Sequence, residues 1–173
     1  MAQNVEIKAR VIDPVIFRKS AAELTGSHGE VIQQTDTFFC APHGRLKLRD
    51  FGDGRGELIR YHRPDANGPK ISNYAISETP DPEGLALLLA VALGVQGIVK
   101  KKRTLFMAGR TRIHLDEVQN LGWFMELEVV LAEGESAEEG EIETHRLMKQ
   151  LGIGETDLVQ GAYLDLIAGK NGQ

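Results

Sequence analysis

The sequence has a single cysteine, few aromatic residues and no long apolar segment. Cys40 has no second cysteine with which to pair, so an intramolecular disulfide and a cysteine-rich zinc site are both excluded. The longest purely apolar run, 85–93, is too short to span a bilayer. The first residues also lack the basic and apolar stretches of a secretory signal. We therefore expect a protein of a reducing compartment, the cytoplasm, with no membrane partner.

The chain also lacks an overall positive charge and the two commonest nucleotide-binding loops. It has 20 Lys and Arg against 25 Asp and Glu, a formal net charge of -5, so a nucleic-acid partner is not expected. Neither a G-x-x-x-x-G-K-[S/T] loop nor a G-x-G-x-x-G loop after a strand is present. Any site for an anion must therefore be local and built from side chains.

The length and composition are those of one globular domain. The chain has 173 residues, of which 42% are hydrophobic and 26% charged. We expect a single domain over 1–173, with its core at about 3–168 and a frayed tail at 169–173.

Most of the predicted secondary structure is β. Residues 4–12 alternate strictly between apolar and polar side chains, the period of a strand. Gly, Pro, Asn and Asp clusters between such segments predict hairpins between antiparallel neighbours. The predicted strands are 4–12, 31–40, 45–50, 57–63, 70–79, 98–108, 110–118 and 123–131.

Four helices are predicted between and after these strands. The second has Asp81 as its N-cap and Gly94 as its terminator. The third has a glutamate-rich start, where carboxylates complement the helix dipole. The four helices are predicted at 14–24, 82–93, 136–151 and 158–167.

Several predicted strands carry two or more ionisable side chains on one face. On a single strand this pattern indicates only a solvent-exposed face. Eight mostly antiparallel strands, however, can remove their edges by closing into a barrel whose interior holds one small ligand. We therefore predict an α+β fold, mainly antiparallel β, with a closed eight-stranded β-barrel, a charged interior and flanking helices. The apolar run at 85–93 is predicted to cover the outside of this barrel.

A lumen lined by both cations and carboxylates suits a polyanion accompanied by a divalent metal. Arg and Lys bind phosphate oxygens, and two Glu spaced two apart on a strand offer the oxygen ligands that Mg²⁺ or Mn²⁺ prefers. Phosphoryl transfer depends mostly on positioning and charge neutralisation, which these groups supply.

Seven short motifs along the chain resemble those of the CYTH superfamily, the triphosphate tunnel metalloenzymes. The first is similar to the family's ExExK signature, and the others follow in the family's order over nearly the whole chain. They are Val5-Glu6-Ile7-Lys8, Asp36-Thr37-Phe38-Phe39, Leu46-Lys47-Leu48-Arg49, Lys101-Lys102-Arg103, Leu115-Asp116-Glu117-Val118, Phe124-Met125-Glu126-Leu127-Glu128 and Tyr163-Leu164-Asp165-Leu166.

The resemblance implies a role for each matching position. It implies that Glu6, Glu126, Glu128 and Asp116 hold one or two Mg²⁺ or Mn²⁺ ions, and that Asp116 and Lys8 take part in catalysis. It also implies a set of substrate-binding residues: Lys8, Lys47, Arg49, Arg60, His62, Lys101, Arg103 and Arg112.

The sequence departs from the family pattern in three places. Asn4 stands at the first glutamate position of ExExK. Asn73 and Ala75 stand where many relatives have acidic residues, and Gly161-Ala162 replaces a basic residue before Tyr163. Each departure predicts a site with fewer charged groups.

The resemblance leaves several functions open. The first is a class IV adenylate cyclase type of reaction, which converts ATP to cyclic AMP and pyrophosphate. The second is a triphosphatase acting on tripolyphosphate, thiamine triphosphate or a nucleoside triphosphate. A third is a module that binds polyphosphate or a nucleotide without turnover, and a fourth is a structural barrel whose charged face is merely wet. The expected partner is a small-molecule triphosphate, and the chain is expected to be a monomer or a homodimer.

Overall fold

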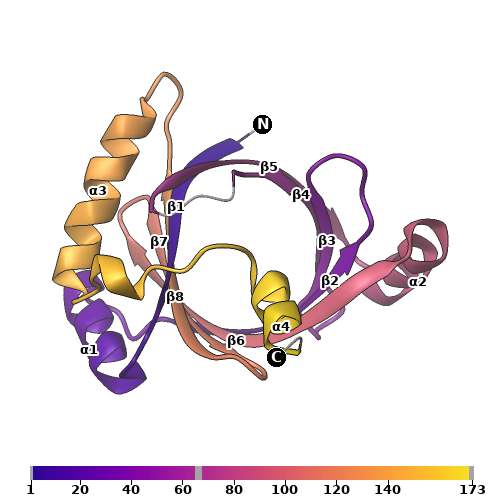
Figure 1. Cartoon of the computed structure of the whole chain (residues 1–173), viewed down its shortest axis with the longest axis horizontal. Coiled ribbons are helices and arrows are strands. Elements are labelled where there is room, and N and C mark those ends of the chain that lie inside the picture. Colours follow the sequence, from indigo (N-terminus) through magenta and orange to yellow (C-terminus); the bar gives the residue numbers. More distant parts are fainter. Residues whose placement is uncertain (1, 65–67, 172–173) are drawn as a thin grey trace.

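The computed structural model describes residues 2–64 and 68–171, and in these residues eight strands form one closed antiparallel barrel (Figure 1). The strand order around the barrel is β1-β5-β4-β3-β2-β6-β7-β8, and β1 closes it by pairing with β8. The strands are β1 (Ala2–Arg10), β2 (Glu30–Phe39), β3 (Arg45–Asp50), β4 (Gly56–His62), β5 (Lys70–Thr79), β6 (Val95–Ala108), β7 (Thr111–Val118) and β8 (Gly122–Val130).

Hairpins build most of the barrel, and three pairings between distant segments close it. Consecutive strands pair from β2 to β5 and again from β6 to β8. Strand β1 pairs with both β5 and β8, and β2 pairs with β6. In the β1–β8 register, Glu6 lies opposite Glu128 and Lys8 lies opposite Glu126. Chain closure therefore brings the first charged motif beside the last acidic one.

Four α-helices and one short 3₁₀ turn accompany the barrel within the described residues. The side chain of Asp13 accepts hydrogen bonds from the amides of Val15 and Ile16, which caps the first helix. Ser136 and Glu139 form a reciprocal capping box at the third. The elements are α1 (Pro14–Thr25), α2 (Pro82–Leu93), α3 (Ala137–Gln150), the 3₁₀ turn (Glu155–Asp157) and α4 (Tyr163–Asn171).

The largest hydrophobic core lies outside the barrel, between its wall and two helices. Apolar odd-numbered residues of β1, β7 and β8, such as Ile7, Ile113 and Leu127, are buried there with Phe17 of α1 and Leu147 of α3. Figure 1 shows α1 and α3 together on this side of the barrel. Because this wall is packed from outside, the even-numbered side chains of the same strands face the lumen.

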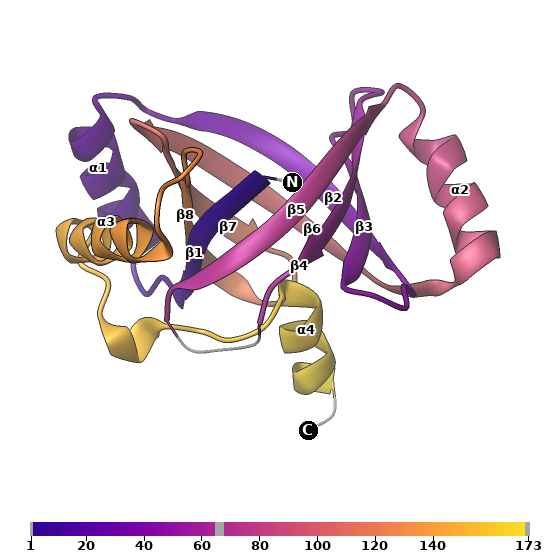
Figure 2. The ribbon, with the colours of Figure 1, turned by 90° about the horizontal axis from the view of Figure 1, so that it is seen from above.

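A second cluster closes one end of the barrel. Phe38, Val99 and Phe124 pack there with Tyr163 of α4, whose ring meets Phe124 edge-on at 5.2 Å between centroids. The chain before α4 crosses this end of the barrel, and α4 lies beside it (Figures 1 and 2).

The sequence predictions of eight strands and a closed barrel are confirmed, with shifts of one to three residues at the ends of several strands. The last helix differs more, since it begins at Tyr163 instead of 158. The chain before it runs extended along β1, where Leu158 bridges Ala9 and the Val159 amide donates to the Lys8 carbonyl. Helix α4 continues to Asn171, the fraying of 169–171 stays a prediction, and 172–173 lie outside the described residues.

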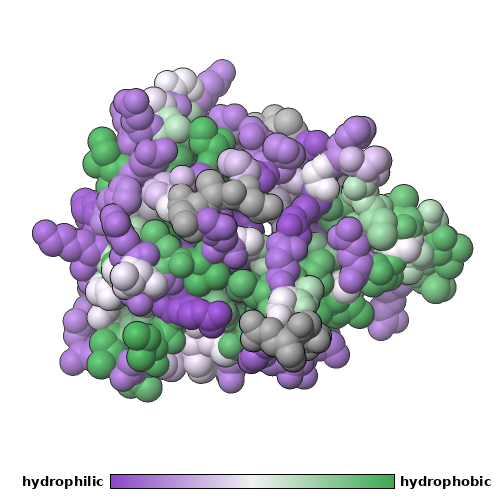
Figure 3. Space-filling model, viewed as in Figure 1, coloured by the Kyte–Doolittle hydropathy of each residue, from purple (hydrophilic) through white to green (hydrophobic). Residues whose placement is uncertain are grey.

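Helix α2 packs against β2 and β3 on the outside of the barrel, as the sequence predicts. It covers part of the barrel, yet Leu87, Leu88 and Val91 point away from it and are 67%, 69% and 82% exposed. Figure 3 shows hydrophobic residues gathered over α2 at this edge of the molecule. No helix in the described part of the chain is long and apolar enough to cross a membrane.

Candidate functional site

The barrel encloses a cavity of about 320 Å³ lined by side chains of all eight strands and of the segment before α4. Cations and carboxylates line it together. The cations among the described lining residues are Lys8, Lys47, Arg49, Arg63, Lys101, Arg103 and Arg112. The carboxylates are Glu6, Asp36, Glu57, Glu126 and Glu128. Such a mixed lumen is costly to dehydrate unless its charges are paired with one another or with a ligand.

Three of the cations converge on one buried carboxylate, that of Asp36. Lys47 donates to it at 2.8 Å, Lys101 donates at 3.2 Å, and Arg49 forms two bonds of 2.8 and 2.9 Å. Burial by itself would raise the pKa of Asp36, but these cations outweigh it and hold the pKa well below its usual range. Strands β3 and β6, which flank β2, thus direct three cations to one point in the lumen.

We call the three cations that converge on Asp36, namely Lys47, Arg49 and Lys101, the cation cluster. Lys101 has the most strongly shifted pKa of the three. Its side chain is 2% exposed. Burial, with neighbouring Arg103, Arg49 and Lys47, lowers its pKa to about 7 despite the opposing charge of Asp36.

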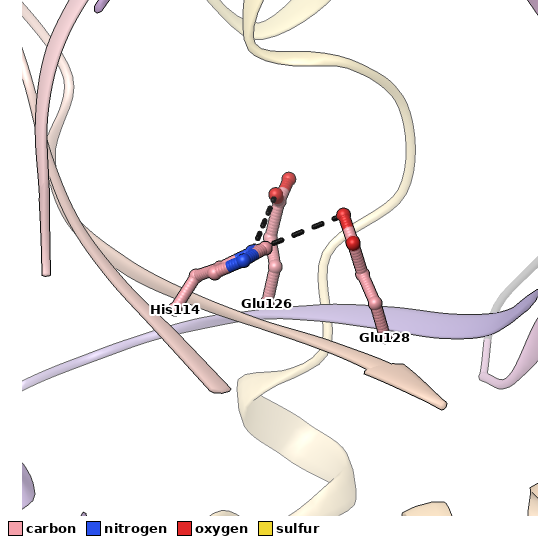
Figure 4. Close-up of side chains that lie close together, drawn as sticks. All are labelled: His114, Glu126 and Glu128. Carbon is pink, nitrogen blue, oxygen red and sulfur yellow. Dashed lines mark ion pairs between the residues drawn. The ribbon is translucent and has the colours of Figure 1, made fainter. Parts of the chain in front are cut away.

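On β7 and β8, His114, Glu126 and Glu128 form a compact group of possible metal ligands. One ligand atom from each lies within 4.8 Å of the others. Nδ1 of His114 is 3.9 Å from a Glu126 oxygen and 3.8 Å from a Glu128 oxygen, and the ring points between the two carboxylates (Figure 4). This nitrogen is buried and makes no hydrogen bond. Burial and the charge of Arg103 lower the pKa of His114, so the imidazole is neutral near pH 7.

Basic residues keep both carboxylates of this group ionised. Lys8 lies 3.1 Å and Arg103 lies 2.6 Å from Glu126, while Arg112 donates to Glu128 at 2.8 Å. Burial would raise the pKa of each glutamate, but Lys8 and Arg103 lower the pKa of Glu126, and His114, when protonated, and Arg112 lower the pKa of Glu128. Two anionic carboxylates and one neutral imidazole therefore face the same space.

Glu6 also lines the lumen, but its carboxylate pairs with a different cation from those of Glu126 and Glu128. It pairs with Arg63, yet burial and the charges of Glu126 and Glu128 leave its pKa raised. Glu6 would give up this pair before it could bind another cation.

The segment before α4 closes one end of the lumen through its polar atoms as well as its packing. The carbonyl of Gly161 accepts from Lys8 and from Arg63, at 3.1 Å each. The Tyr163 hydroxyl donates to Asp116 at 2.8 Å, and the Lys8 ammonium lies 3.8 Å from the Tyr163 ring centroid.

The other end of the lumen has one apolar side. Strands β2, β5 and β6 and the residue after β3 carry apolar or aromatic lining residues toward this end, whereas β4 carries Glu57 there. The apolar and aromatic residues include Ile32, Phe51, Ile76 and Leu105. The opposite side, made by β7, β8 and β1, is polar.

Most of the site residues predicted from the sequence lie together in this lumen. These are Glu6, Lys8, Lys47, Arg49, Lys101, Arg103, Arg112, Glu126 and Glu128. Their roles as clamp or metal ligands stay predictions, whereas their shared location is observed.

Asp116 does not lie where the prediction requires. It points inward but is completely buried, outside the lining of the cavity. Arg103 donates to its two oxygens at 2.7 and 2.6 Å, and Tyr163 also donates to it. With its oxygens occupied by these donors, Asp116 fixes Arg103 in position and is not placed to bind a metal or substrate.

The two substrate-binding residues predicted on β4 do not lie in the lumen. Arg60 and His62 are not among the cavity lining, which on this strand and just after it consists of Glu57, Ile59, Tyr61 and Arg63. Because side chains alternate along a strand, even-numbered residues of β4 lie on the outer face. Arg63 thus supplies the cation that Arg60 and His62 were expected to provide.

Asp36 and His114 line the lumen, although no role in the site was predicted for them from the sequence. Asp36 opens one of the seven motifs, and His114 shares a strand face with Arg112. Period-two alternation alone places both side chains in the lumen once the inward face is known. Tyr163 and Gly161 reach the site only through the long-range docking of the C-terminal segment.

The departures from the family pattern have unequal consequences. Asn4 does face the lumen, is buried, and its Oδ1 has no hydrogen-bond partner. Asn73 and Ala75 are not in the cavity lining, and Asn73 accepts a hydrogen bond from Gln3 instead. The substitutions at 73 and 75 therefore do not thin the site.

Comparison with known proteins agrees with this architecture. Residues 2–163 match the CYTH domain family. A protein from Pyrococcus horikoshii OT3 has 26% identity and a TM-score of 0.82, covering 94% of this chain and 98% of its own. A candidate adenylate cyclase from Vibrio parahaemolyticus has 18% identity and a TM-score of 0.75, covering 95% and 97%. No match is found among curated proteins.

A third solved structure shares the fold at lower similarity. It is a candidate adenylyl cyclase from Hippeastrum, described as revealing a dominant triphosphatase activity. It has 16% identity and a TM-score of 0.62, and it covers 87% of this chain and 88% of its own. Since the family match extends over nearly all of the sequence, this chain belongs to the CYTH domain family.

Proposed function

We propose that this CYTH domain protein binds a nucleoside triphosphate with a divalent cation inside its barrel and converts it as a class IV adenylate cyclase does, releasing pyrophosphate. One observation carries the proposal. The cation cluster of Lys47, Arg49 and Lys101 and the ligand group of His114, Glu126 and Glu128 line the same closed lumen. A triphosphate with a bound cation complements both.

The cation cluster is suited to phosphate oxygens. Arg49 presents two N–H groups in the planar fork that fits a phosphate, and Lys47 of the same strand and Lys101 of β6 add point charges. Because burial leaves Lys101 with a pKa of about 7, an incoming anion favours its charged form. Arg63 and Lys8, which donate to Gly161, extend this positive surface toward the closed end.

The ligand group fits a divalent cation. Nδ1 of His114 lies between two ionised carboxylates without a hydrogen-bond partner, and in the tautomer protonated at Nε2 it offers an electron pair to a cation. Oxygen ligands suit Mg²⁺ or Mn²⁺, and one imidazole nitrogen shifts the balance toward Mn²⁺. A cation bound there would neutralise charge on the phosphates. Glu6 can join the set if Arg63 turns to the substrate.

The remaining residues position these groups. Asp116 and Tyr163 fix Arg103, which in turn holds Glu126. Lys8 lies between Glu126 and the C-terminal segment, where its charge offsets the negative charge that develops on the phosphates.

The apolar side of the open end favours a substrate with an organic group. Phe51, Ile32 and Ile76 offer contact surface to a base, and two lining residues, on β1 and on β2, have unpartnered amide oxygens. Those of Asn4 and Gln34 are buried acceptors that can receive hydroxyl donors of a ribose. Inorganic tripolyphosphate would leave both features unused.

A triphosphatase is the second candidate. The Hippeastrum structure shares this fold and is described by a dominant triphosphatase activity. The same clamp and cation would then activate a water toward the terminal phosphorus.

A phosphorus NMR time course distinguishes these functions. Purified protein is incubated with ATP, and separately with tripolyphosphate, in Mg²⁺, in Mn²⁺ and without metal. Cyclic AMP with pyrophosphate supports the cyclase, and orthophosphate supports the triphosphatase. Resonances that broaden without turnover indicate a binding module, and unchanged spectra contradict the proposal. Lys101→Ala should abolish the response, whereas Lys102→Ala, which changes an exposed neighbour outside the cavity lining, should not.

A further inference from the structure

One carboxylate in the lining of the lumen has no part in the proposed function, that of Glu57 near the start of β4. Glu57 is half-buried, and Phe51 and Ile76 line the same open end of the cavity. Its carboxylate makes no hydrogen bond or ion pair with any residue that the structure describes. A carboxylate held partly away from water without a donor is unfavourable, so Glu57 calls for a donor from a ligand.

Neither neighbouring strand supplies a partner for Glu57. Arg49 lies directly opposite it in the β3–β4 register, but this guanidinium donates to Asp36 at 2.8 and 2.9 Å instead. On the other side, Glu57 lies opposite Glu78 of β5, an exposed residue of the same charge. Directly opposed like charges repel each other, so β5 also leaves the charge of Glu57 uncompensated.

Two further acceptors in the same cavity have no partner. They are the amide oxygens of Asn4 and Gln34, whose residues are only 3% and 5% exposed. With Glu57, they place unpaired acceptors on three strands of one lumen. A ligand that complements this lumen is therefore rich in hydrogen-bond donors, such as the hydroxyls of a ribose and the N–H groups of a base.

The order of residues along the lumen determines which part of a nucleoside triphosphate meets Glu57. On β2 the lining residues run from Asp36 through Gln34 to Ile32, so Gln34 lies between the cation cluster and the open end. On β4, Glu57 is the last lining residue before the open end. Phosphates at the cation cluster place the ribose near Gln34 and the base at the open end, beside Glu57.

The chemistry of a carboxylate favours one base over the others. Its two oxygens accept two parallel hydrogen bonds and donate none. Guanine places two N–H donors side by side, at N1 and at the 2-amino group. Adenine and cytosine have an acceptor nitrogen beside their amino group, and uracil has a carbonyl on each side of its N–H. Each of these three bases turns an acceptor toward the carboxylate, which repels it.

We propose that Glu57 selects the base of the substrate, and that the favoured substrate is a guanine nucleoside triphosphate bound through N1–H and the 2-amino group. This inference rests on the proposed function, because phosphates at the cation cluster bring the base to Glu57. Phe51 and Ile76 limit the access of water to this contact, which strengthens both hydrogen bonds.

Metal-free titration calorimetry with GTP, inosine triphosphate, ATP and tripolyphosphate tests the proposal without turnover. Inosine triphosphate lacks only the 2-amino group of GTP, so the wild-type chain should bind GTP at least about tenfold more tightly, the effect of one hydrogen bond to a charged group. Glu57→Gln should reduce this ratio to below about threefold, because the amide turns a donor toward one of the two guanine donors. Glu78→Gln removes the same charge from the directly opposite position, outside the cavity lining, and should leave the ratio unchanged.

Several results would overturn the proposal. Equal affinities for GTP and inosine triphosphate, or ATP bound as tightly as GTP, would mean that the carboxylate does not read the base. A ratio that persists in Glu57→Gln would assign base recognition to another residue. In these cases, bound tripolyphosphate leaves the proposed function standing, whereas both proposals fail if no triphosphate binds. The wild-type comparison needs no substitution, so it decides the question even if Glu57→Gln fails to fold.

Discussion

Replacing Asp36 by asparagine removes the negative charge on which Lys47, Arg49 and Lys101 converge. The side chain is 2% exposed, and four hydrogen bonds from these cations reach its two oxygens. An asparagine of the same shape keeps an acceptor but offers no charge. We expect the ligand-free protein to lose stability, because three buried cations then repel one another without a counter-charge.

Breaking a buried ion pair from one side typically costs about 3–5 kcal/mol of unfolding free energy. For a domain of this size, that corresponds to a fall in melting temperature of about 10 °C. A second, opposite effect is expected of Asp36→Asn: a bound triphosphate should restore the missing negative charge and bind more tightly than to the wild type. Saturation at about 100 times the dissociation constant then returns about 2.7 kcal/mol.

Urea unfolding with and without metal-free tripolyphosphate measures both effects. Asp53→Asn is the control, since Asp53 pairs with Arg55 on the exposed surface and its loss should leave the midpoint and the ligand response unchanged. An Asp36→Asn variant as stable as the wild type would refute the reasoning about the cation cluster. So would a destabilised variant that tripolyphosphate stabilises no more than it does the wild type.

Three further predictions concern the same lumen. Arg49→Ala should raise the dissociation constant of a triphosphate at least about tenfold and that of a monophosphate far less; equal losses in titration calorimetry would remove Arg49 from the clamp. Because the pKa of Lys101 is lowered to about 7, the free side chain is largely neutral at pH 8 and charged at pH 6, and an anion favours the charged form. Triphosphate binding should therefore take up close to one proton at pH 8 and almost none at pH 6, which calorimetry in two buffers of different ionisation enthalpy detects; buffer-independent heats at pH 8 would contradict this. Asn4→Glu should lower the Mn²⁺ concentration needed for half-maximal binding in a metal titration, and an unchanged titration would place Asn4 away from the cation.

The sequence predicted the barrel well because its strands alternate so regularly. A period of two defines two faces for each strand, but it does not say which face is inward. On β3 and β8 one face is apolar and the other charged, so the assignment of Arg49 and Glu126 was straightforward. On β4 both faces carry ionisable groups, and the prediction chose Arg60 and His62 where the closed barrel turns Tyr61 and the following Arg63 inward.

The rest of the site depends on contacts between distant segments. The burial of Asp116 requires Tyr163, which lies 47 residues further along the chain. Its carboxylate can stay ionised without water because Arg103 and Tyr163 donate to it, and no local pattern shows that. The extended path of 158–162 likewise follows from pairing with β1, which overrides the helical prediction for those residues.

A crystal of the protein grown with Mn²⁺ and a non-hydrolysable ATP analogue tests the central claim most directly, because the anomalous signal of manganese locates the cation. We expect a manganese peak within ligand distance, about 2.2 Å, of the Glu126 and Glu128 carboxylates. Phosphate oxygens should be bonded to Lys47 and Arg49 in the same lumen. Manganese and nucleotide found only on the outer surface, with Asp36 still holding its three cations, would contradict it.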